Sequence, residues 1–458
     1  MYSNFKWSIK KCATTLDTIP TLGKQHTTSA SSRSTSLSSQ TFACSMFEGQ
    51  TSPCIISTPH FFTPIRSDLK EVHSCRCMAE GKPHTLSPSA WNRFETCPRM
   101  YWLSRQRLPR KAGMAASLGT AVHASIEDLL QVDLSGRKSD ETHWLPNMAE
   151  KFLKQRWEEE KEIFFATPRR PMWKEKEWDK AKRMQRGAIK MLLGLVGAEG
   201  VTPLKTTIGI WNSILSRVIA VEGELRTSDN RLMGRLDMLF ADVDSNGELR
   251  GWIVADLKTG RAPESKLKPE VERQLLLYRD ILLSNNPNAP PVKTEGWYTE
   301  NSTRYTALGE SVMGKALEAW EATQPTDVPL EATPGQSSCG GFCDWKAWCP
   351  HWWNWRLENG TLGTEDFSDS VILLHHFDGR NGSGIAEICE PANAEGRAMP
   401  TGIQVPINFD GRGKEALQEL LATGHQGPIF IGSAMTNRET WRVGHWCDVL
   451  AWSPIPDA

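Results

Sequence analysis

LMGRLDMLFADVDSNGELRGWIVADLKTG, residues 232–260, is the stretch that decides the fold. Its centre contains Asn246-Gly247, a pair typical of a hairpin turn between two strands. If the chain folds back there, residues equidistant from the turn face each other, and Asp237 falls opposite Asp256. Side chains alternate along a strand, so Lys258 emerges on the same face as Asp256. The stretch therefore predicts two carboxylates and an ammonium group on one patch.

The apolar run Trp252–Ala255 lies directly beside these charges. Such a run is normally buried on both faces, where an isolated charge is costly unless it is paired or bound to a metal. Two facing carboxylates repel each other, and a divalent cation relieves that repulsion. The alternative is a solvated hairpin edge with an ordinary ion pair, either Asp256 to Lys258 or Asp237 to Arg235. The hairpin alone leaves both interpretations open.

At 458 residues the chain has room for two or three domains. The net charge of −1 creates no overall field that favours a polyanion, so a nucleic-acid site must be local. No apolar run approaches the roughly 20 residues that span a bilayer, and we expect no membrane attachment. Residues 1–80 are rich in Ser and Thr and poor in acids, which predicts disorder. Two alternatives are an organellar transit peptide and an over-extended start, with the protein beginning near Met78; we favour the latter.

Two helices and a basic segment are predicted on the N-terminal side of the hairpin. Ser87-Pro88 is a helix start signal, and five basic residues without an acid between Arg99 and Lys111 suit a phosphate backbone or an ordinary solvated surface. The apolar stripe of SLGTAVHASIEDLLQ predicts a second helix that carries His123, which on its own is more typical of a core or surface residue than of a ligand. A charged, Trp-rich helical insertion is expected over 145–200.

A further helix, EVERQLLLYRDILLS, follows the hairpin. It places Gln274 and Tyr278 four residues apart on one face, although two polar groups on a helix surface are a sufficient explanation.

The last hundred residues, 362–458, predict a separate β-rich unit. Three strands, a helix over 413–422 and two more strands have the order of an OB-fold barrel. Such barrels often bind single strands by stacking bases on aromatic side chains. The side chains available for this are Phe430, Trp441, Trp446 and Arg442. A purely structural β domain is the alternative.

Three cysteines, Cys339, Cys343 and Cys349, fall within one short segment of a chain whose other cysteines are scattered. Without secretory features, this spacing suggests metal or iron–sulfur ligation rather than disulfides. Three thiolates leave a four-thiolate site one ligand short. Three reduced and inert cysteines are the alternative.

Taken together, these stretches resemble the RecB/Cas4-like branch of the PD-(D/E)XK nuclease superfamily over roughly residues 84–356. The matching pieces, in the order of that family, are SPSAWNRFETCPRMYW, LGTAVHASIEDLL, GRLDML, ADLKTG, QLLLY and CGGFCDWKAWCP. The resemblance implies an α/β fold, with a restriction-endonuclease-like core and a helical insertion in 81–358. The small C-terminal β domain, with its OB-like order, would follow at 362–458.

The resemblance also implies the roles of the site residues. The implied ligands of Mg²⁺ or Mn²⁺ are the side chains of His123, Asp237 and Asp256 and the carbonyl of Leu257. Lys258 would position or activate the attacking water, and Gln274 and Tyr278 would support the active site and the DNA strand.

Iron–sulfur members of that branch bring one cysteine of the first helix to three near the end. The implied ligands of a [4Fe–4S] cluster are therefore Cys97, Cys339, Cys343 and Cys349. The family spacing is Cys-x2-Cys-x5-Cys, whereas this chain has one more residue between Cys339 and Cys343. The later half of the spacing matches that of the family, and zinc is an alternative occupant of four thiolates.

The function that we expect from the sequence is metal-dependent hydrolysis of DNA, in the manner of a RecB-like exonuclease acting in repair or recombination. The alternative is a catalytically inactive DNA-binding protein of the same fold with a structural iron–sulfur or zinc site. The expected partner is DNA, as single strands or duplex ends; a helicase or repair partner is not identifiable. The expected location is the cytoplasm, with the nucleoid, or an organelle if residues 1–80 are a transit peptide.

Overall fold

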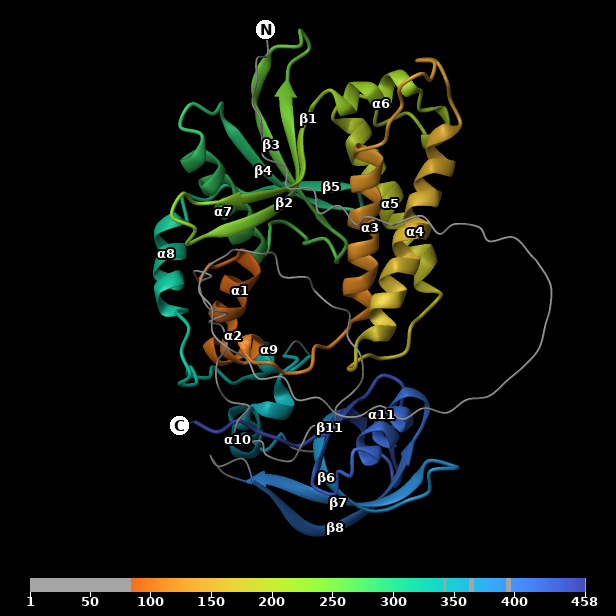
Figure 1. Cartoon of the computed structure of the whole chain (residues 1–458), viewed down its shortest axis with the longest axis vertical. Helices are drawn as coiled ribbons and strands as arrows, with labels where there is room; N and C mark the ends of the chain where they lie inside the picture. Colours follow the sequence, from red (N-terminus) through yellow and green to blue (C-terminus); the bar gives the residue numbers. More distant parts are fainter. Residues whose placement is uncertain (1–83, 342, 362–365, 393–396, 458) are drawn as a thin grey trace, which may run out of the picture. The chain divides into compact units, whose positions relative to one another are not determined.

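The computed structural model of the chain describes residues 84–341, 343–361, 366–392 and 397–457 (Figure 1). The expectations for residues 1–80 lie outside these ranges. In the part that is described, no helix is both long and apolar enough to cross a membrane.

A five-stranded sheet organises the N-terminal part of the described chain. Its strands lie in sequence order: β1 (Val218–Arg226), β2 (Met233–Val243), β3 (Leu249–Lys258), β4 (Val292–Tyr298) and β5 (Thr303–Thr306). Neighbouring strands are antiparallel except β3 and β4, which are parallel. A parallel pair needs a crossover connection, and α7 (Pro269–Asn285) provides it. This mixed sheet with helices agrees with the predicted α/β class.

The β2–β3 hairpin has the register that the sequence predicts. Met238 pairs with Ala255, and the register continues to Asp242 and Gly251, where a bulge shifts it by one residue. The turn contains Gly247 at φ 82°, a left-handed conformation in which glycine carries no steric penalty. Extending the register by one pair in the other direction sets Asp237 opposite Asp256.

Helices cover both faces of the sheet. Those before it in the chain are α1 (Pro88–Thr96), α2 (Pro98–Arg105), α3 (Met114–Leu130), α4 (Trp144–Ala166), α5 (Glu177–Gly194) and α6 (Ile208–Leu215). On one face α3, α5 and α6 pack against residues such as Phe240 and Trp297, whose rings stack 5.9 Å apart. On the other face α1, α7 and α8 (Met313–Ala322) pack against Leu239 and Val254. The helical insertion expected over 145–200 corresponds to α4 and α5.

The first predicted helix is divided in two at Cys97. Ser87 caps α1 by accepting the Ala90 amide at 3.3 Å, as the start signal predicts. Cys97 is extended, at φ −166°, because the following Pro98 disfavours a helical conformation in the residue before it. The thiol of Cys97 is therefore placed at a corner of the chain rather than within a helix.

The cysteine segment is followed by a closed β barrel. Short helices α9 (Gln336–Cys339), η3 (Lys346–Trp348) and α10 (Pro350–Glu358) lead to the strands of the barrel. These are β6 (Phe367–Phe377), β7 (Ser383–Ala392), β8 (Arg397–Phe409), β9 (Ile429–Met435), β10 (Trp441–Val443) and β11 (Asp448–Ala451), with α11 (Gly411–Ala422) before β9. β6 pairs with β7 and β9, β8 pairs with β7 and runs parallel to β10, and β10 closes onto β9. The order of three strands, a helix and further strands agrees with the OB-like order that the sequence predicts, but three strands, β9, β10 and β11, follow the helix in place of the two expected.

The aromatic residues proposed from the sequence for base stacking do not form a binding surface. Phe430 and Trp441 are 2 % and 8 % exposed and belong to hydrophobic cores. Trp446 donates its indole N–H to the carbonyl of Ser433, and Arg442 pairs with Asp410. Trp441 belongs to the core of the barrel, whereas Phe430 packs against Trp353 of α10, and the order of strands alone reveals neither contact.

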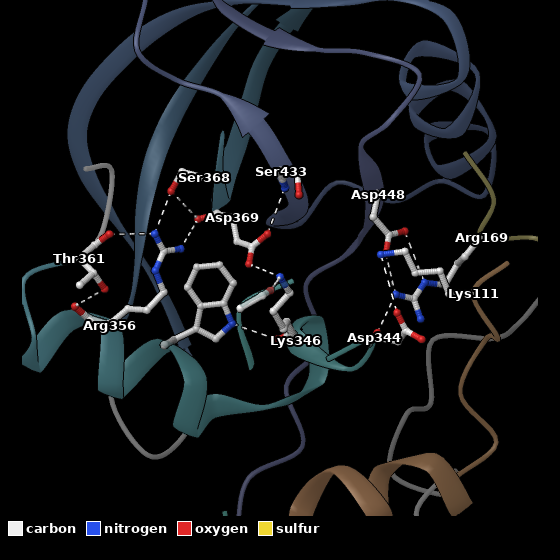
Figure 2. Close-up of polar contacts among 12 residues, drawn as sticks. Lys111, Arg169, Asp344, Lys346, Arg356, Thr361, Ser368, Asp369, Ser433 and Asp448 are labelled. Atoms are coloured by element: carbon white, nitrogen blue, oxygen red, sulfur yellow. Dashed lines mark hydrogen bonds and ion pairs between the residues drawn. The ribbon is translucent and has the colours of Figure 1, made fainter. Parts of the chain in front are cut away.

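Buried cations attach the barrel to the cysteine segment and to the segment that follows α4 (Figure 2). Arg356 on α10 is 1 % exposed and donates to the carbonyls of Asp369 and Thr361. Lys346 lies 2.5 Å from the carboxylate of Asp369. A second set joins Arg169, in the segment after α4, to Asp448 of β11 at 2.6 Å. Removing one partner of such a buried pair leaves an uncompensated charge, so these contacts fix the barrel firmly.

A substitution at Gly187 on α5 tests how closely the helical insertion packs against the sheet. A Cβ at this position would lie 1.9 Å from the backbone oxygen of Thr299, so the helix or the end of β4 would have to shift. We expect Gly187→Ala to cost more than about 3 kcal/mol of unfolding free energy in urea titrations. Gly314→Ala is the matched control, because a Cβ on α8 meets nothing within 4 Å and should be neutral or slightly stabilising. Equal effects of the two substitutions would contradict this packing.

Candidate active site

Two carboxylates on adjacent strands form the centre of the site. Asp237 of β2 accepts the amide hydrogen of Leu257 at 2.7 Å, a contact from the neighbouring strand. Asp256 of β3 has a side chain that is 4 % exposed. The hairpin therefore buries Asp256, as the apolar run beside it predicts, and leaves the side chain of Asp237 17 % exposed.

Lys258 and Gln274 hold the Asp256 carboxylate from one side. Lys258 Nζ lies 2.5 Å from Asp256 Oδ2 and donates to Gln274 Oε1 at 3.0 Å. The amide nitrogen of Gln274 lies 3.1 Å from Asp256 Oδ1 and 2.8 Å from the hydroxyl of Tyr278. Gln274 and Tyr278, the predicted pair on α7, thus form one hydrogen-bond network with the hairpin. Both the oxygen and the nitrogen of the Gln274 amide take part in it.

His123 approaches Asp237 from α3. Its Nδ1 lies 3.3 Å from Asp237 Oδ2, and about a quarter of the side chain is exposed. Gly119, one turn earlier, allows α3 to approach β3 closely, because a Cβ there would lie 2.8 Å from the Thr259 hydroxyl. Gly119 and His123, both in the motif LGTAVH, therefore both contribute to the packing of α3 against the β2–β3 hairpin.

The absence of a side chain at Gly234 leaves room for the ring of Tyr278. A Cβ at Gly234 would lie 2.5 Å from the ring of Tyr278, so the aromatic side chain packs directly on the β2 backbone. Burial raises the pKa of Tyr278 above its ordinary value, and the nearby Asp256 raises it further. The phenol is therefore a neutral hydrogen-bonding group that fixes Gln274.

Burial and pairing set opposite directions for the pKa values of the two acids. Burial raises the pKa of Asp256 above its ordinary value, in spite of the opposing charge of Lys258. Burial also acts to raise the pKa of Asp237, but His123 and the Leu257 amide hold it below the ordinary value. In the same way burial lowers the pKa of His123, and Asp237 more than offsets this, so the net shift is upward. Two carboxylates with different affinities for protons thus lie on one patch.

Glu222 is a third acid of the site that the sequence reasoning did not assign. The β1–β2 register pairs Val221 with Met238 and Gly223 with Leu236, which sets Glu222 opposite Asp237. Glu222 has φ 52°, uncommon outside glycine, and its side chain is only 18 % exposed and is paired with Arg235. Burial and the charge of Asp237 raise the pKa of Glu222 to about 7. A row of three carboxylates therefore crosses β1, β2 and β3.

A signal for Glu222 is present in the sequence. The stretch Ser228-Asp229-Asn230 is a turn signal of the same kind as Asn246-Gly247, and Thr227 indeed bonds to Leu232 across it. Folding the chain back at this turn sets Glu222 opposite Asp237. Glu224, two residues further along β1, is instead 57 % exposed and pairs with Arg226.

The donor set fits a hard divalent cation such as Mg²⁺ or Mn²⁺. It comprises buried carboxylates and an imidazole, and Asp256 Oδ2 is a buried oxygen without a hydrogen bond apart from its ion pair with Lys258. In the described ranges no three His, Cys, Asp or Glu side chains are arranged to hold a metal ion as they stand. The predicted ligands are instead paired, His123 with Asp237 and Asp256 with Lys258. Leu257 contributes its amide to Asp237, and the role predicted for its carbonyl stays a prediction.

The four predicted cysteines converge, although they do not form such a metal-holding group either. All four line one cavity of about 10 Å³. Burial raises the pKa of Cys343 and Cys339, and that of Cys349 to about 11, so these thiols are neutral unless an ion binds them. The amide of Thr333 donates to Cys97 Sγ at 3.3 Å.

A sequence model described as the PD-(D/E)XK nuclease superfamily matches residues 85–350, more than half of the chain. The match contains the sheet, α7, all the acids described above and the four converging cysteines. No curated protein matches the chain.

Replacing Glu222 tests the burial of the third carboxylate. Because its pKa is about 7 in the folded protein, its ionisation lowers the free energy of unfolding as the pH rises from about 4.5 to 7. We expect Glu222→Gln to raise the melting temperature of the metal-free protein by a few degrees at pH 8 and to change it little at pH 5. Glu224→Gln, on the same strand but exposed, should show no such dependence. A loss of stability that is equal at both pH values would show that the pair with Arg235 dominates instead.

Proposed function

The chain belongs to the PD-(D/E)XK nuclease superfamily, whose members are mostly metal-dependent nucleases, and we propose that it hydrolyses DNA with Mg²⁺ or Mn²⁺ as a RecB-like exonuclease. The observation that carries this proposal is the placement of Lys258 Nζ 2.5 Å from the buried carboxylate of Asp256, next to Asp237 on the adjacent strand. A role in DNA repair or recombination and a cytoplasmic location at the nucleoid are part of the same proposal.

In the proposed reaction the acids hold the cation, and the other residues position the reacting groups. Asp237, Asp256 and His123 would hold Mg²⁺ or Mn²⁺, with Glu222 close to them. When bound, the ion neutralises charge on the scissile phosphate and makes a water molecule more acidic.

Lys258 is the residue best placed to orient the nucleophile. Its ammonium group is fixed by Asp256 and Gln274, so its direction is set before substrate binds. Burial lowers the pKa of Lys258, but the charge of Asp256 more than compensates, and the pKa lies above its ordinary value. The side chain is therefore a permanent cation that offsets the charge developing on the phosphate, rather than a base that removes a proton.

In this scheme His123 would both hold the ion and contact Asp237, and Tyr278 is a positioning residue. His123 holds the Asp237 carboxylate in place from α3, and the Tyr278 hydroxyl holds the Gln274 amide. Gln274 in turn contacts both Asp256 and Lys258, so the orientation of two charged groups depends on one amide.

For the four cysteines we propose a [4Fe–4S] cluster that joins α2 to the end of the nuclease part. The proposal rests on their convergence on one cavity, with the buried cation Arg99 close to Cys349 and Cys97. Its role would be structural, because it closes a very long loop and so constrains the unfolded chain. A zinc ion bound by the four thiolates would close the same loop, and four cysteines that line one cavity are a ligand set that zinc accepts.

Substitutions at the hairpin test the hydrolytic function. We expect Asp256→Ala and Lys258→Ala to reduce cleavage of labelled single-stranded and duplex DNA by at least about a thousandfold, because each removes a charge that acts on the reacting phosphate. Cleavage by the unchanged protein should require Mg²⁺ or Mn²⁺ and cease with EDTA.

The matched controls are Glu248→Ala and Lys205→Ala, an exposed acid and an exposed lysine away from the network. Both should cleave like the unchanged protein. Undiminished turnover in Asp256→Ala, or DNA binding without any cleavage in the unchanged protein, would refute the hydrolytic assignment.

Removing one cysteine tests the cluster. Cys349→Ala should lose the brown colour, iron and sulfide of anaerobically purified protein and lower its melting temperature, whereas Cys389→Ala, a buried thiol in the barrel, should keep the metal. One equivalent of zinc without iron would replace the cluster with a zinc site. Absence of both metals would refute a metal centre.

A further inference from the structure

A recess of about 690 Å³ lies between the end of α2 and the cysteine segment. Residues 104–111, which leave α2, form one side together with Arg93 of α1. Asp344 and Trp345, which follow Cys343, form the other side. We call this recess the basic groove. It shares no residue with the network around Asp256.

The basic groove contains far more positive than negative charge. The cations that line it are Arg93, Arg105, Arg107, Arg110 and Lys111, and the one acid among its lining residues is Asp344. Lys111 is 3.8 Å from Asp344 and from Asp448 (Figure 2). Within the described ranges the four arginines form no ion pair. Arg99, which the sequence grouped with this basic segment, is 0 % exposed and binds Asp457, so it does not belong to the groove.

Two of these cations, Arg93 and Arg105, are close enough to affect each other. Burial lowers the pKa of Arg93, and the charge of Arg105 lowers it further against the effect of Asp344. Arg105 also contributes, after burial, to the lowering of the His84 pKa to about 4. Like charges gathered in a recess are unfavourable in the free protein, and a bound polyanion reverses the sign of that energy. The chain as a whole is nearly neutral, so this excess is local.

An aromatic side chain completes the groove. Trp345 is half-buried beside Trp348, with ring centroids 6.0 Å apart, and lines the groove together with the arginines. A recessed basic channel with an aromatic wall is the usual arrangement for a single strand, whose backbone lies on the cations while a base stacks on the ring. The barrel offers no such surface with the aromatics named for it, because Phe430 and Trp441 are buried.

We propose that the basic groove binds the sugar–phosphate backbone of a single DNA strand, with Arg105, Arg107 and Arg110 on successive phosphates and Trp345 against a base. The proposal rests on the proposed function in one respect only: the strand held there is the substrate of the hairpin site. The groove would act on affinity and not on the hydrolytic step.

The test is the salt dependence of binding, measured with the full chain in EDTA so that no strand is cut. Fluorescently labelled single-stranded oligonucleotides are titrated over a range of salt concentrations. Replacing Arg105, Arg107 and Arg110 together with Ala should weaken binding about tenfold or more at low salt. It should also reduce the slope of log K against log salt by about 2, since each phosphate contact on a single strand contributes about 0.7.

Three comparisons separate this proposal from a general effect of charge or folding. Replacing the same three arginines with Lys should retain most of the affinity, because a phosphate accepts either cation. Replacing Arg183, Arg186 and Lys190, exposed cations on α5, with Ala should leave the slope unchanged. Trp345→Ala should weaken single-strand binding without altering the slope.

Nuclease assays distinguish a failure of this proposal from a failure of the proposed function. At saturating substrate with Mg²⁺, the triple Ala variant should keep its kcat and raise its KM. Equal affinity and slope in that variant and the unchanged protein would overturn the groove assignment even if DNA is cleaved. An equal loss with the α5 variant, or a loss confined to duplex DNA, would overturn it as well.

Discussion

The rest of the structure depends on the cost of burying two like charges side by side. Asp237 and Asp256 lie on adjacent strands of a sheet whose faces are covered by helices, where water cannot screen them. Each acid is therefore held by a basic side chain and by a hydrogen-bond donor: His123 and the Leu257 amide for one, Lys258 and Gln274 for the other. These partners come from α3, β3 and α7, so the helices that cover the sheet also supply the groups that make it chemically active.

Close approach of the backbones makes this arrangement possible. Gly119 lets α3 reach the end of β3, and Gly234 lets the ring of Tyr278 lie on β2. A larger side chain at either position would displace a helix that carries part of the network. The short motifs LGTAVH and GRLD thus combine a functional residue with the glycine that brings its partner within reach.

The cysteine segment connects three parts of the molecule. Cys343 lines the cavity of the four thiols, while the next residues, Asp344 and Trp345, line the basic groove. Lys346, one residue later, pairs with Asp369 at the base of the barrel. The position of this one segment therefore sets the cavity of the four thiols, the groove and the attachment of the barrel together.

The sequence by itself determined the hairpin, its register and the order of the barrel strands. These follow from local rules: Asn246-Gly247 sets the turn, and the period of two then fixes Asp237, Asp256 and Lys258 relative to one another. The tertiary structure decided what depends on packing between distant elements. It buried Phe430, Trp441 and Arg99, and left the arginines around Arg107 without acidic partners in the described chain. Whether a side chain faces a core, a partner or solvent is set by the elements that pack over it, and the spacing of residues along the chain does not contain that information.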